Sequence, residues 1–248
     1  MRPLKRIHDW RRKRLELKYL VDFGIKYVNF VTRNEFENQS YSTFNERPAE
    51  YAFVFSRLAK YSPVSILDVG TGKTALPHLM RNCGFLVTAI DNIVDYWPEG
   101  MINRHYHVIN DDITNTSLQG SFDMITCIST LEHISDYDRA VANMTGLLKP
   151  GGRLVLTFPF NQNNYCENVY DLPGSTAPRN MPFTTRAFSA GQVEKWCTDN
   201  RLTMKDQEFW RYFTGDFWTV GERLGVPERT GADQPHQISC LVLEKQPG

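Results

Sequence analysis

The feature of this chain that most constrains its fold is a series of short apolar runs, each bounded by turn residues. The segments between these runs are long enough for helices, notably 74–82 and 136–148, and the second is followed by the helix-stopping residues Pro150 and Gly151. Short continuous apolar runs are typical of buried parallel strands, and their alternation with helices predicts a βαβ sheet. The runs that we interpret as strands are 65–70, 85–91, 107–111, 122–128 and 152–160.

The rest of the chain extends this pattern at both ends. Residues 48–60 have helical apolar spacing, and residues 189–200 have a helical pattern with Ser189 as N-cap. Residues 201–209 and 238–245 read as two further strands. The sequence therefore predicts an α/β fold, doubly wound, with a mostly parallel seven-stranded sheet and helices on both faces.

Two stretches break the alternation and set the expected domain organisation. Residues 161–188 are rich in Asn, Pro and Tyr without clear periodicity, and we interpret them as a substrate-side insertion or lid. Residues 211–237 are read as a second irregular insertion. We expect an N-terminal basic helical extension at 1–47 and a single folded domain at 48–248.

Charge is balanced over the whole chain and unbalanced at its start. The 28 basic and 28 acidic residues give a net charge of zero, so the overall field gives no argument for a nucleic-acid partner. Residues 1–20 hold eight Lys or Arg against Asp9 and Glu16. This basic helix is read either as a solvated face with Leu15, Leu17, Leu20 and Trp10 packing inward, or as a contact for an anionic substrate or membrane surface.

Neither a membrane span nor a secretory signal is expected. No apolar run approaches the roughly 20 residues that a spanning helix needs, and the basic start lacks an apolar h-region with a cleavage site. The five cysteines are widely spaced without a CxxC pair, which indicates reduced thiols. We expect a cytoplasmic protein and leave peripheral membrane contact open. The sequence does not indicate an oligomeric state.

A glycine turn follows the first strand of this sheet. Asp68 lies near the end of the run 65–70, and Gly70 and Gly72 belong to the turn that follows the strand. Glycine tolerates a positive φ and has no Cβ to block a bound molecule, so such a turn can lie against a ligand. Asp91 ends the second strand about 20 residues later, at the spacing where an acidic side chain accepts hydrogen bonds from ribose hydroxyls.

In these features, and in Phe122-Asp123 and Leu148-Lys149-Pro150-Gly151-Gly152, the chain resembles the class I S-adenosylmethionine-dependent methyltransferases over about residues 48–160. The resemblance implies S-adenosyl-L-methionine as cofactor. It also implies that an acidic residue after the first strand supports the methionine end of the cofactor, and that Asp112 reads the adenine amino group. Thr74 stands where the family has a third glycine. The implied cofactor-binding residues are Asp68, Gly70, Thr71, Gly72, Asp91, Asn92, Asp112, Ile113 and Ser129.

Two other classes of protein remain alternatives. Gly70-x-Gly72-x-x-Ala75 also matches a loose dinucleotide fingerprint, so an NAD(P)-dependent oxidoreductase is one rival, although dinucleotide folds usually keep position 68 apolar. A catalytically silent S-adenosylmethionine-binding module is the other. A phosphate-binding P-loop is rejected, because that motif needs a glycine where this chain has Leu67.

One histidine is a candidate for the chemistry. His133 lies in Leu131-Glu132-His133, directly after the fourth strand, where the family has its active-site loop. An imidazole that titrates near neutrality can accept the proton of a hydroxyl acceptor, which favours O-methylation with His133 as base; a capping or packing role is the alternative. The loop is similar to that of quinone O-methyltransferases, some of which hold a divalent metal. We expect no metal here, because Ser129 stands where such a site wants another carboxylate.

The acceptor is less well defined by the sequence. Aromatic residues in and near the irregular segments either line an acceptor pocket or bury the insertion, and the first option favours a small-molecule or sugar-like acceptor, anionic or lipid-linked given the basic N-terminus. Arg47 either pairs with the carboxylate of the methyl donor or is an ordinary surface arginine. The aromatic residues are Phe158, Phe160, Tyr165, Tyr170, Phe183, Trp210, Tyr212, Phe213, Phe217 and Trp218.

Overall fold

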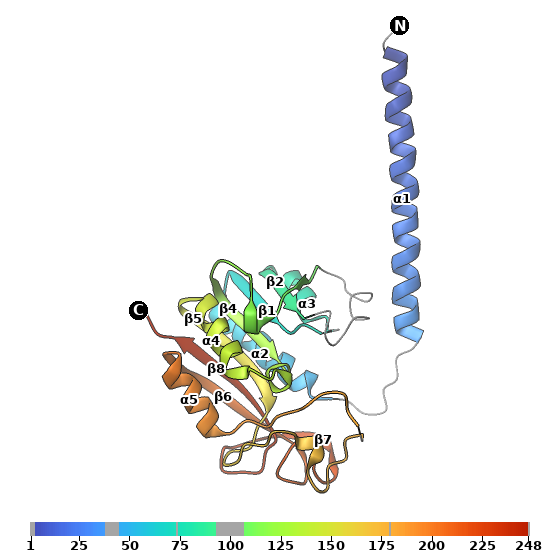
Figure 1. Ribbon diagram of the computed structural model, residues 1–248. Coiled ribbons are helices and arrows are strands. Elements are labelled where there is room, and N and C mark those ends of the chain that lie inside the picture. The colour runs from blue at the N-terminus through green and yellow to red at the C-terminus, as the bar shows by residue number, and fades with distance from the viewer. Residues whose placement is uncertain (1–2, 38–44, 73, 93–106, 179, 248) are drawn as a thin grey trace. The chain divides into compact units, whose positions relative to one another are not determined.

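The computed structural model describes residues 3–37, 45–72, 74–92, 107–178 and 180–247. The chain divides into two units, Met1–Phe44 and Asn45–Gly248, each of which is described by itself. The first unit is one long helix, α1 (Pro3–Glu37). The second is an α/β domain built around a central sheet (Figure 1).

The sheet has eight strands in the order β3-β2-β1-β4-β5-β8-β6-β7. Neighbouring strands are parallel from β3 through β5, whereas β8 is antiparallel to both β5 and β6, and β7 is antiparallel to β6. The sheet is therefore mostly parallel, with an antiparallel part at the side of β8, β6 and β7. The strands are β1 (Ser65–Val69), β2 (Leu86–Asp91), β3 (Ile109–Asn110), β4 (Phe122–Ile128), β5 (Leu148–Pro159), β6 (Leu202–Phe213), β7 (Arg223–Thr230) and β8 (Ile238–Lys245).

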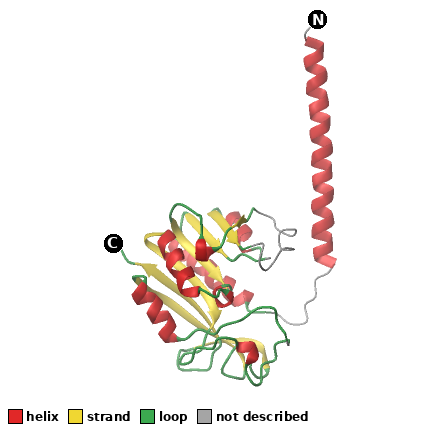
Figure 2. Ribbon diagram, in the orientation of Figure 1, coloured by secondary structure: helices red, strands yellow, loops and turns green. Residues whose placement is uncertain are grey.

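Helices cover both faces of this sheet, as Figure 2 shows. Successive side chains of a strand point to opposite faces. Leu67 therefore packs in the core under α4 and α5, whereas Ile66 packs in the core under α2 and α3. The two cores explain why the strands of this sheet are continuous apolar runs rather than alternating ones. The helices of the domain are α2 (Arg47–Tyr61), α3 (Leu76–Asn82), α4 (Tyr137–Leu147) and α5 (Ala190–Asp199).

The α/β fold with a doubly wound sheet is confirmed, but two details of the prediction are wrong. The sheet has eight strands rather than seven, because β7 (Arg223–Thr230) lies within the segment 211–237 that was expected to be irregular. This strand is mostly exposed and contains Pro227, which an edge strand tolerates, so it lacks an apolar signal. The third strand is also shorter than the expected 107–111, since β3 comprises Ile109–Asn110 alone.

The first interpretation of the basic segment had apolar side chains packing inward, and α1 is described as a unit by itself. Leu15, Leu17 and Leu20 are 54%, 61% and 70% exposed. The side chain of Trp10 lies outside the described residues. A helix taken by itself has no second element on which to bury such side chains, so inward packing stays a prediction.

The sheet order places its switch point between β1 and β4. From β1 the chain proceeds to β2 and β3 on one side, and then returns to β4 and β5 on the other. In doubly wound sheets, ligands bind outside the carboxyl ends of the strands at this point. A binding site is therefore expected among the residues that follow β1, β2, β3 and β4.

Candidate functional site

A cavity of about 550 Å³ opens at the carboxyl ends of four neighbouring strands. Its walls come from the turn after β1, the end of β2, the residues after β3 and the loop after β4, together with Arg47 at the start of α2. Volumes of roughly 300–1,000 Å³ are typical of small-molecule sites. The lining residues are Arg47, Val69, Gly70, Thr71, Gly72, Thr74, Ile90, Asp91, Asn92, Asp111, Asp112, Ile113, Thr114, Ser129, Thr130, His133, Ile134, Ser135 and Asp136.

The glycine turn after β1 needs both of its glycines. Gly70 has φ +70°, and a Cβ there would lie 1.9 Å from the side chain of Thr130. Gly72 has φ +57°, and a Cβ there would meet no atom of the described residues within 4 Å. The Asp91 carboxylate accepts the N–H of Gly72 at 2.6 Å, which joins the turn to the end of β2. The turn is therefore held closed against β4 at Gly70 and left open at Gly72.

Eight of the nine expected cofactor-binding residues line this cavity, and Asp68 does not. Asp68 lies behind the turn, 2% exposed, where it accepts hydrogen bonds from Thr71 at 2.8 Å and Thr126 at 2.5 Å. Burial raises the pKa of Asp68 to about 6, against the lowering effect of these two hydroxyls. Asp68 holds the turn from beneath, and its direct role toward a ligand remains a prediction.

The residues after β3 form the opposite end of the cavity. The carboxylate of Asp112 caps a short 3-10 turn, Ile113–Asn115, by accepting the backbone N–H and the hydroxyl of Thr114, both at 2.8 Å. Ile113 is buried beneath it. Asp112 and Ile113 thus lie together at the cavity, with Asp112 exposed and one of its oxygens used locally.

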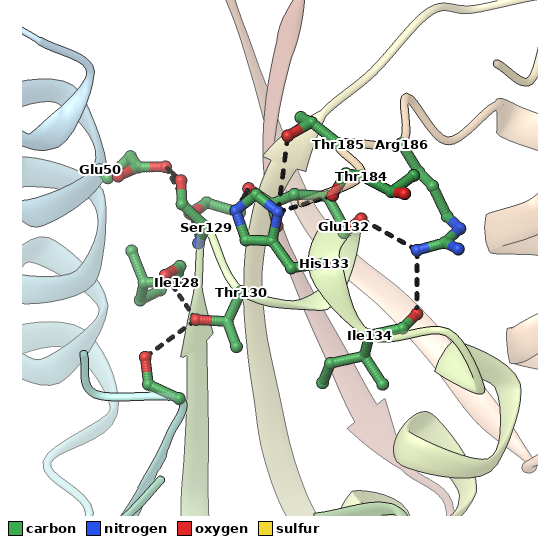
Figure 3. A network of polar contacts seen from close by, with 12 residues as sticks. Glu50, Ile128, Ser129, Thr130, Glu132, His133, Ile134, Thr184, Thr185 and Arg186 are labelled. Carbon is green, nitrogen blue, oxygen red and sulfur yellow. Dashed lines mark hydrogen bonds and ion pairs between the residues drawn. The ribbon is translucent and has the colours of Figure 1, made fainter. Parts of the chain in front are cut away.

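A buried carboxylate on α2 fixes the end of β4. Glu50 is fully buried and accepts the hydroxyls of Ser129 at 2.5 Å and Thr157 at 2.7 Å. Figure 3 shows the contact with Ser129. The other oxygen of Glu50 pairs with Arg47 at 2.9 Å. Ser129 has φ +44°, so this backbone is held in the left-handed region by its contacts. Sequence analysis did not identify Glu50, and Arg47 lines the cavity rather than the open surface.

His133 reaches the cavity from the loop after β4, and its orientation is set by a distant carbonyl. Its Nδ1 lies 2.9 Å from the carbonyl oxygen of Thr184 (Figure 3). A carbonyl only accepts, so Nδ1 carries the proton and Nε2 carries the lone pair. Burial lowers the pKa of His133, and the ring is therefore neutral at pH 7.

The neighbours of His133 complete this arrangement. Glu132 is 3% exposed, and one of its carboxyl oxygens has no hydrogen-bond partner among the described residues. Burial raises the pKa of Glu132 well above the usual range. Its other oxygen lies 3.9 Å from His133 Nε2, the ring nitrogen that carries the lone pair. Among the residues that the structure describes, no group of His, Cys, Asp and Glu is placed to hold a metal ion.

Arg186 binds the segment 161–188 to the His133 loop. Its Nη1 donates to the carbonyls of Glu132 and Ile134 at 3.2 and 3.3 Å, and its Nη2 pairs with Glu167 at 2.6 Å. The backbone N–H of Arg186 also donates to the Glu132 carbonyl at 3.1 Å. Sequence analysis missed Thr184 and Arg186, because neither lies near His133 in the chain and a backbone carbonyl carries no sequence signal.

The aromatic residues offered for an acceptor pocket are placed elsewhere. None of the ten lines the described cavity. Phe158 and Phe160 belong to one core and Tyr212 and Phe213 to the other, so most of this set packs the domain. Phe183 is the exception, since its ring meets the His133 ring edge to face at 4.9 Å.

Comparison with known proteins agrees with this geometry. The model of a methyltransferase domain family matches residues 43–219. The ubiquinone biosynthesis O-methyltransferase of Coxiella burnetii is 28% identical over 153 residues, which cover 57% of this chain and 64% of the relative. The chain thus matches less than two thirds of that relative's length.

Solved structures show the same fold at low identity. A S-adenosylmethionine-dependent methyltransferase from Clostridium acetobutylicum has a TM-score of 0.53 at 14% identity, over 92% of this chain and 99% of that chain. The 1,6-didemethyltoxoflavin-N1-methyltransferase of Burkholderia thailandensis, solved with S-adenosylhomocysteine, has a TM-score of 0.54 at 14% identity, over 93% and 89%.

Proposed function

The chain belongs to this methyltransferase domain family, and we propose that it is an S-adenosylmethionine-dependent enzyme that methylates an oxygen of a small-molecule acceptor. The observation that carries the proposal is that one cavity is lined both by the glycine turn with Asp91 and by a histidine whose Nε2 is basic. The first part suits a nucleoside and the second suits a hydroxyl acceptor. The name of the Coxiella burnetii relative supports oxygen as the methylated atom.

The residues present fit S-adenosylmethionine. The open space over Gly72 leaves room for a bound molecule against the backbone. Asp91 lies at the cavity one strand away, at the place where this fold binds ribose, and Asp112 and Ile113 lie at the far end for the base. When bound, the cofactor supplies a methyl group on a sulfonium, which is already activated for displacement.

The residues around His133 supply the acid–base chemistry. The Thr184 carbonyl holds the ring through Nδ1, so Nε2 accepts the proton of the acceptor hydroxyl. With the cofactor bound, the acceptor oxygen would take the methyl group as the carbon–sulfur bond breaks, which would leave S-adenosylhomocysteine, a neutral thioether. His133 then returns its proton to water. The main task of the remaining residues is to position acceptor and donor in line.

The finer identity of the acceptor is part of the proposal. We propose a phenol- or catechol-like small molecule, with a sugar-like hydroxyl compound as the second candidate. A lipid-linked or anionic acceptor, used in the cytoplasm at a membrane surface, is supported by the basic residues 1–20. The position of the aromatic residues in the cores removes one argument for a sugar acceptor.

Turnover with labelled methyl donor tests the proposal. The purified chain is incubated with S-adenosylmethionine and a panel of catechols, phenols and sugars, each with and without an isoprenoid tail. We expect a methyl ether and S-adenosylhomocysteine in equal amounts with a phenolic acceptor. Cofactor binding without product from any acceptor would support a silent module, and tight binding of NAD instead would support an oxidoreductase.

A further inference from the structure

The long helix α1, taken by itself, presents a wide apolar surface. From Leu17 to Arg33, its charged residues fall on one narrow stripe at Lys18, Asp22, Lys26 and Arg33, and Glu35 and Glu37 follow at the end of the helix. The positions of the stripe are separated by four, four and seven residues, which places them on one side of a helix of 3.6 residues per turn. The remaining circumference is left to other side chains.

Large apolar side chains occupy that remaining circumference. Each of them is more than half exposed, with values from 51% to 71%. Together they form a face much wider than the stripe of roughly 100° by which a helix usually packs on a core. These residues are Leu17, Tyr19, Leu20, Val21, Phe23, Ile25, Tyr27 and Phe30.

The pattern argues against a membrane span and against a two-stranded coiled coil. In the part of the chain that the structure describes, no helix is long and apolar enough to cross a bilayer. A dimeric coiled coil needs a narrow seam with a period of 3.5 residues, whereas this face is broad and contains Gly24. A helix that lies in the plane of a membrane interface combines a side rich in Lys and Arg with an apolar side. In this part of α1, Lys18 and Lys26 lie on one side and apolar side chains occupy the rest.

The charge of residues 1–20 indicates which kind of surface α1 would bind. Residues 1–20 carry eight Lys or Arg and two acidic residues in a chain whose net charge is zero. Lys13 and Lys18, at the start of the apolar face, are exposed. We propose that α1 lies along an anionic lipid surface, with its apolar face in the acyl boundary and its basic residues at the headgroups. A basic segment beside an apolar helix supplies the two signals that stable attachment needs.

This inference rests on α1 and not on the methyl-transfer reaction. The test is flotation of the full chain with vesicles of phosphatidylcholine alone or with about 30% phosphatidylglycerol, a content that gives a negative surface potential. We expect flotation with the anionic vesicles alone, weakened at high salt because surface charges are screened. The double variant Leu20→Gln/Phe23→Gln should reduce the bound fraction at least about tenfold, because two apolar side chains are lost from the bilayer.

A matched control removes two exposed apolar side chains from the folded domain instead. Val64 and Leu86 are 65% and 68% exposed, so Val64→Gln/Leu86→Gln should float like the unmodified chain. Unchanged binding of S-adenosylhomocysteine by both variants shows that the domain is folded. Equal flotation with neutral vesicles, no flotation at all, or no effect of the α1 variant would overturn the proposal. Self-association that the α1 variant abolishes, without vesicle binding, would assign the face to a second copy of the chain.

Discussion

The side of the cavity at the ends of β1 and β2 is built from neighbours in the sequence, whereas the side at the end of β4 depends on distant ones. Gly72 and Asp91 are 19 residues apart and meet through one hydrogen bond between adjacent strands. His133 and Thr184 are 51 residues apart, and their contact needs the whole segment 161–188 to return across the sheet. Under the proposed function the first side would hold the methyl donor and the second would face the acceptor, and we call them the donor side and the acceptor side. A short motif therefore specifies the donor side, while long-range packing specifies the acceptor side. Substitutions on the donor side should weaken cofactor binding, whereas substitutions on the acceptor side should lower kcat.

The largest expected effect separates chemistry from cofactor binding. His133→Ala should lower kcat by about 10²- to 10⁴-fold, the usual contribution of a general base. Its affinity for S-adenosylhomocysteine should stay within about twofold, since the donor side is intact. Single-turnover assays and calorimetry measure the two quantities. His78→Ala, on α3 and outside the cavity lining, serves as control. Unchanged turnover in His133→Ala would remove this residue from the mechanism.

A stability measurement probes the buried acid beneath the donor side. Because the pKa of Asp68 is about 6 when folded and ordinarily 3.8, ionising it at pH 7.5 opposes folding by about 3 kcal/mol. Asp68→Asn should therefore stabilise the domain at pH 7.5 by up to about that amount, and the gain should shrink as pH falls from 6 to 4. Urea unfolding at pH 7.5 and pH 4.5 measures it.

Asp123 provides a control of opposite sign. Its hydrogen bond from Lys149 lowers the pKa of Asp123 to about 2, so its ionised form stabilises the fold above the ordinary pKa and is lost as pH falls toward 2. Asp123→Asn should therefore destabilise the domain at pH 7.5. A loss of stability in Asp68→Asn that matches the loss in Asp123→Asn would refute the account of a raised pKa.

The next effect concerns Asp91, which ends β2 and accepts the N–H of Gly72 in the glycine turn. Asp91→Asn should raise the Kd for S-adenosylhomocysteine by about 10- to 100-fold, because hydrogen bonds to a charged group contribute about 1.5–3 kcal/mol each. The value of kcat at saturating cofactor should change much less. Asp206→Asn alters a carboxylate of β6 that pairs with Arg57 and should leave the Kd unchanged. A drop in kcat with an unaltered Kd would mean that Asp91 acts in the chemical step rather than in cofactor binding, and would contradict the account.

The smallest effect tests how the acceptor side is held together. His133 is active as a base when its ring is neutral. Burial lowers the pKa of His133 from its ordinary value of 6.5, so the ring stays neutral to a lower pH than a free imidazole does. The positive charge of Arg186 contributes to that lowering, so Arg186→Gln should shift the acid limb of the pH–rate profile to higher pH and reduce kcat by about tenfold, a loss of the order of one hydrogen bond.

Glu167→Gln keeps the Arg186 charge and its carbonyl contacts while removing an exposed ion-pair partner. Glu167 is 65% exposed, so water can replace it as a partner of Arg186. The value of kcat should therefore change by less than about twofold, and the acid limb should not move upward. Equal behaviour of the two variants would mean that Arg186 acts only through general stability.

Sequence could predict the sheet and the donor side because their signals are local. The run Phe122 to Ile128 was assigned as a strand with the bounds that β4 has, and the glycine turn and Asp91 follow from spacing along the chain. By contrast, β7 is an exposed edge strand without an apolar pattern. The contact of Thr184 with His133 involves a main-chain oxygen, which any residue carries. Glu50 lies on a helix that otherwise reads as core packing, so its burial beneath Ser129 could not be inferred from pattern.

The most direct test of the central claim is a crystal structure of the chain with S-adenosylhomocysteine. We predict density across the carboxyl ends of β1, β2 and β3, with the ribose at Asp91, the base near Ile113 and the sulfur directed toward His133. Density at another place on the domain, or an empty cavity in crystals at saturating ligand, would contradict the account.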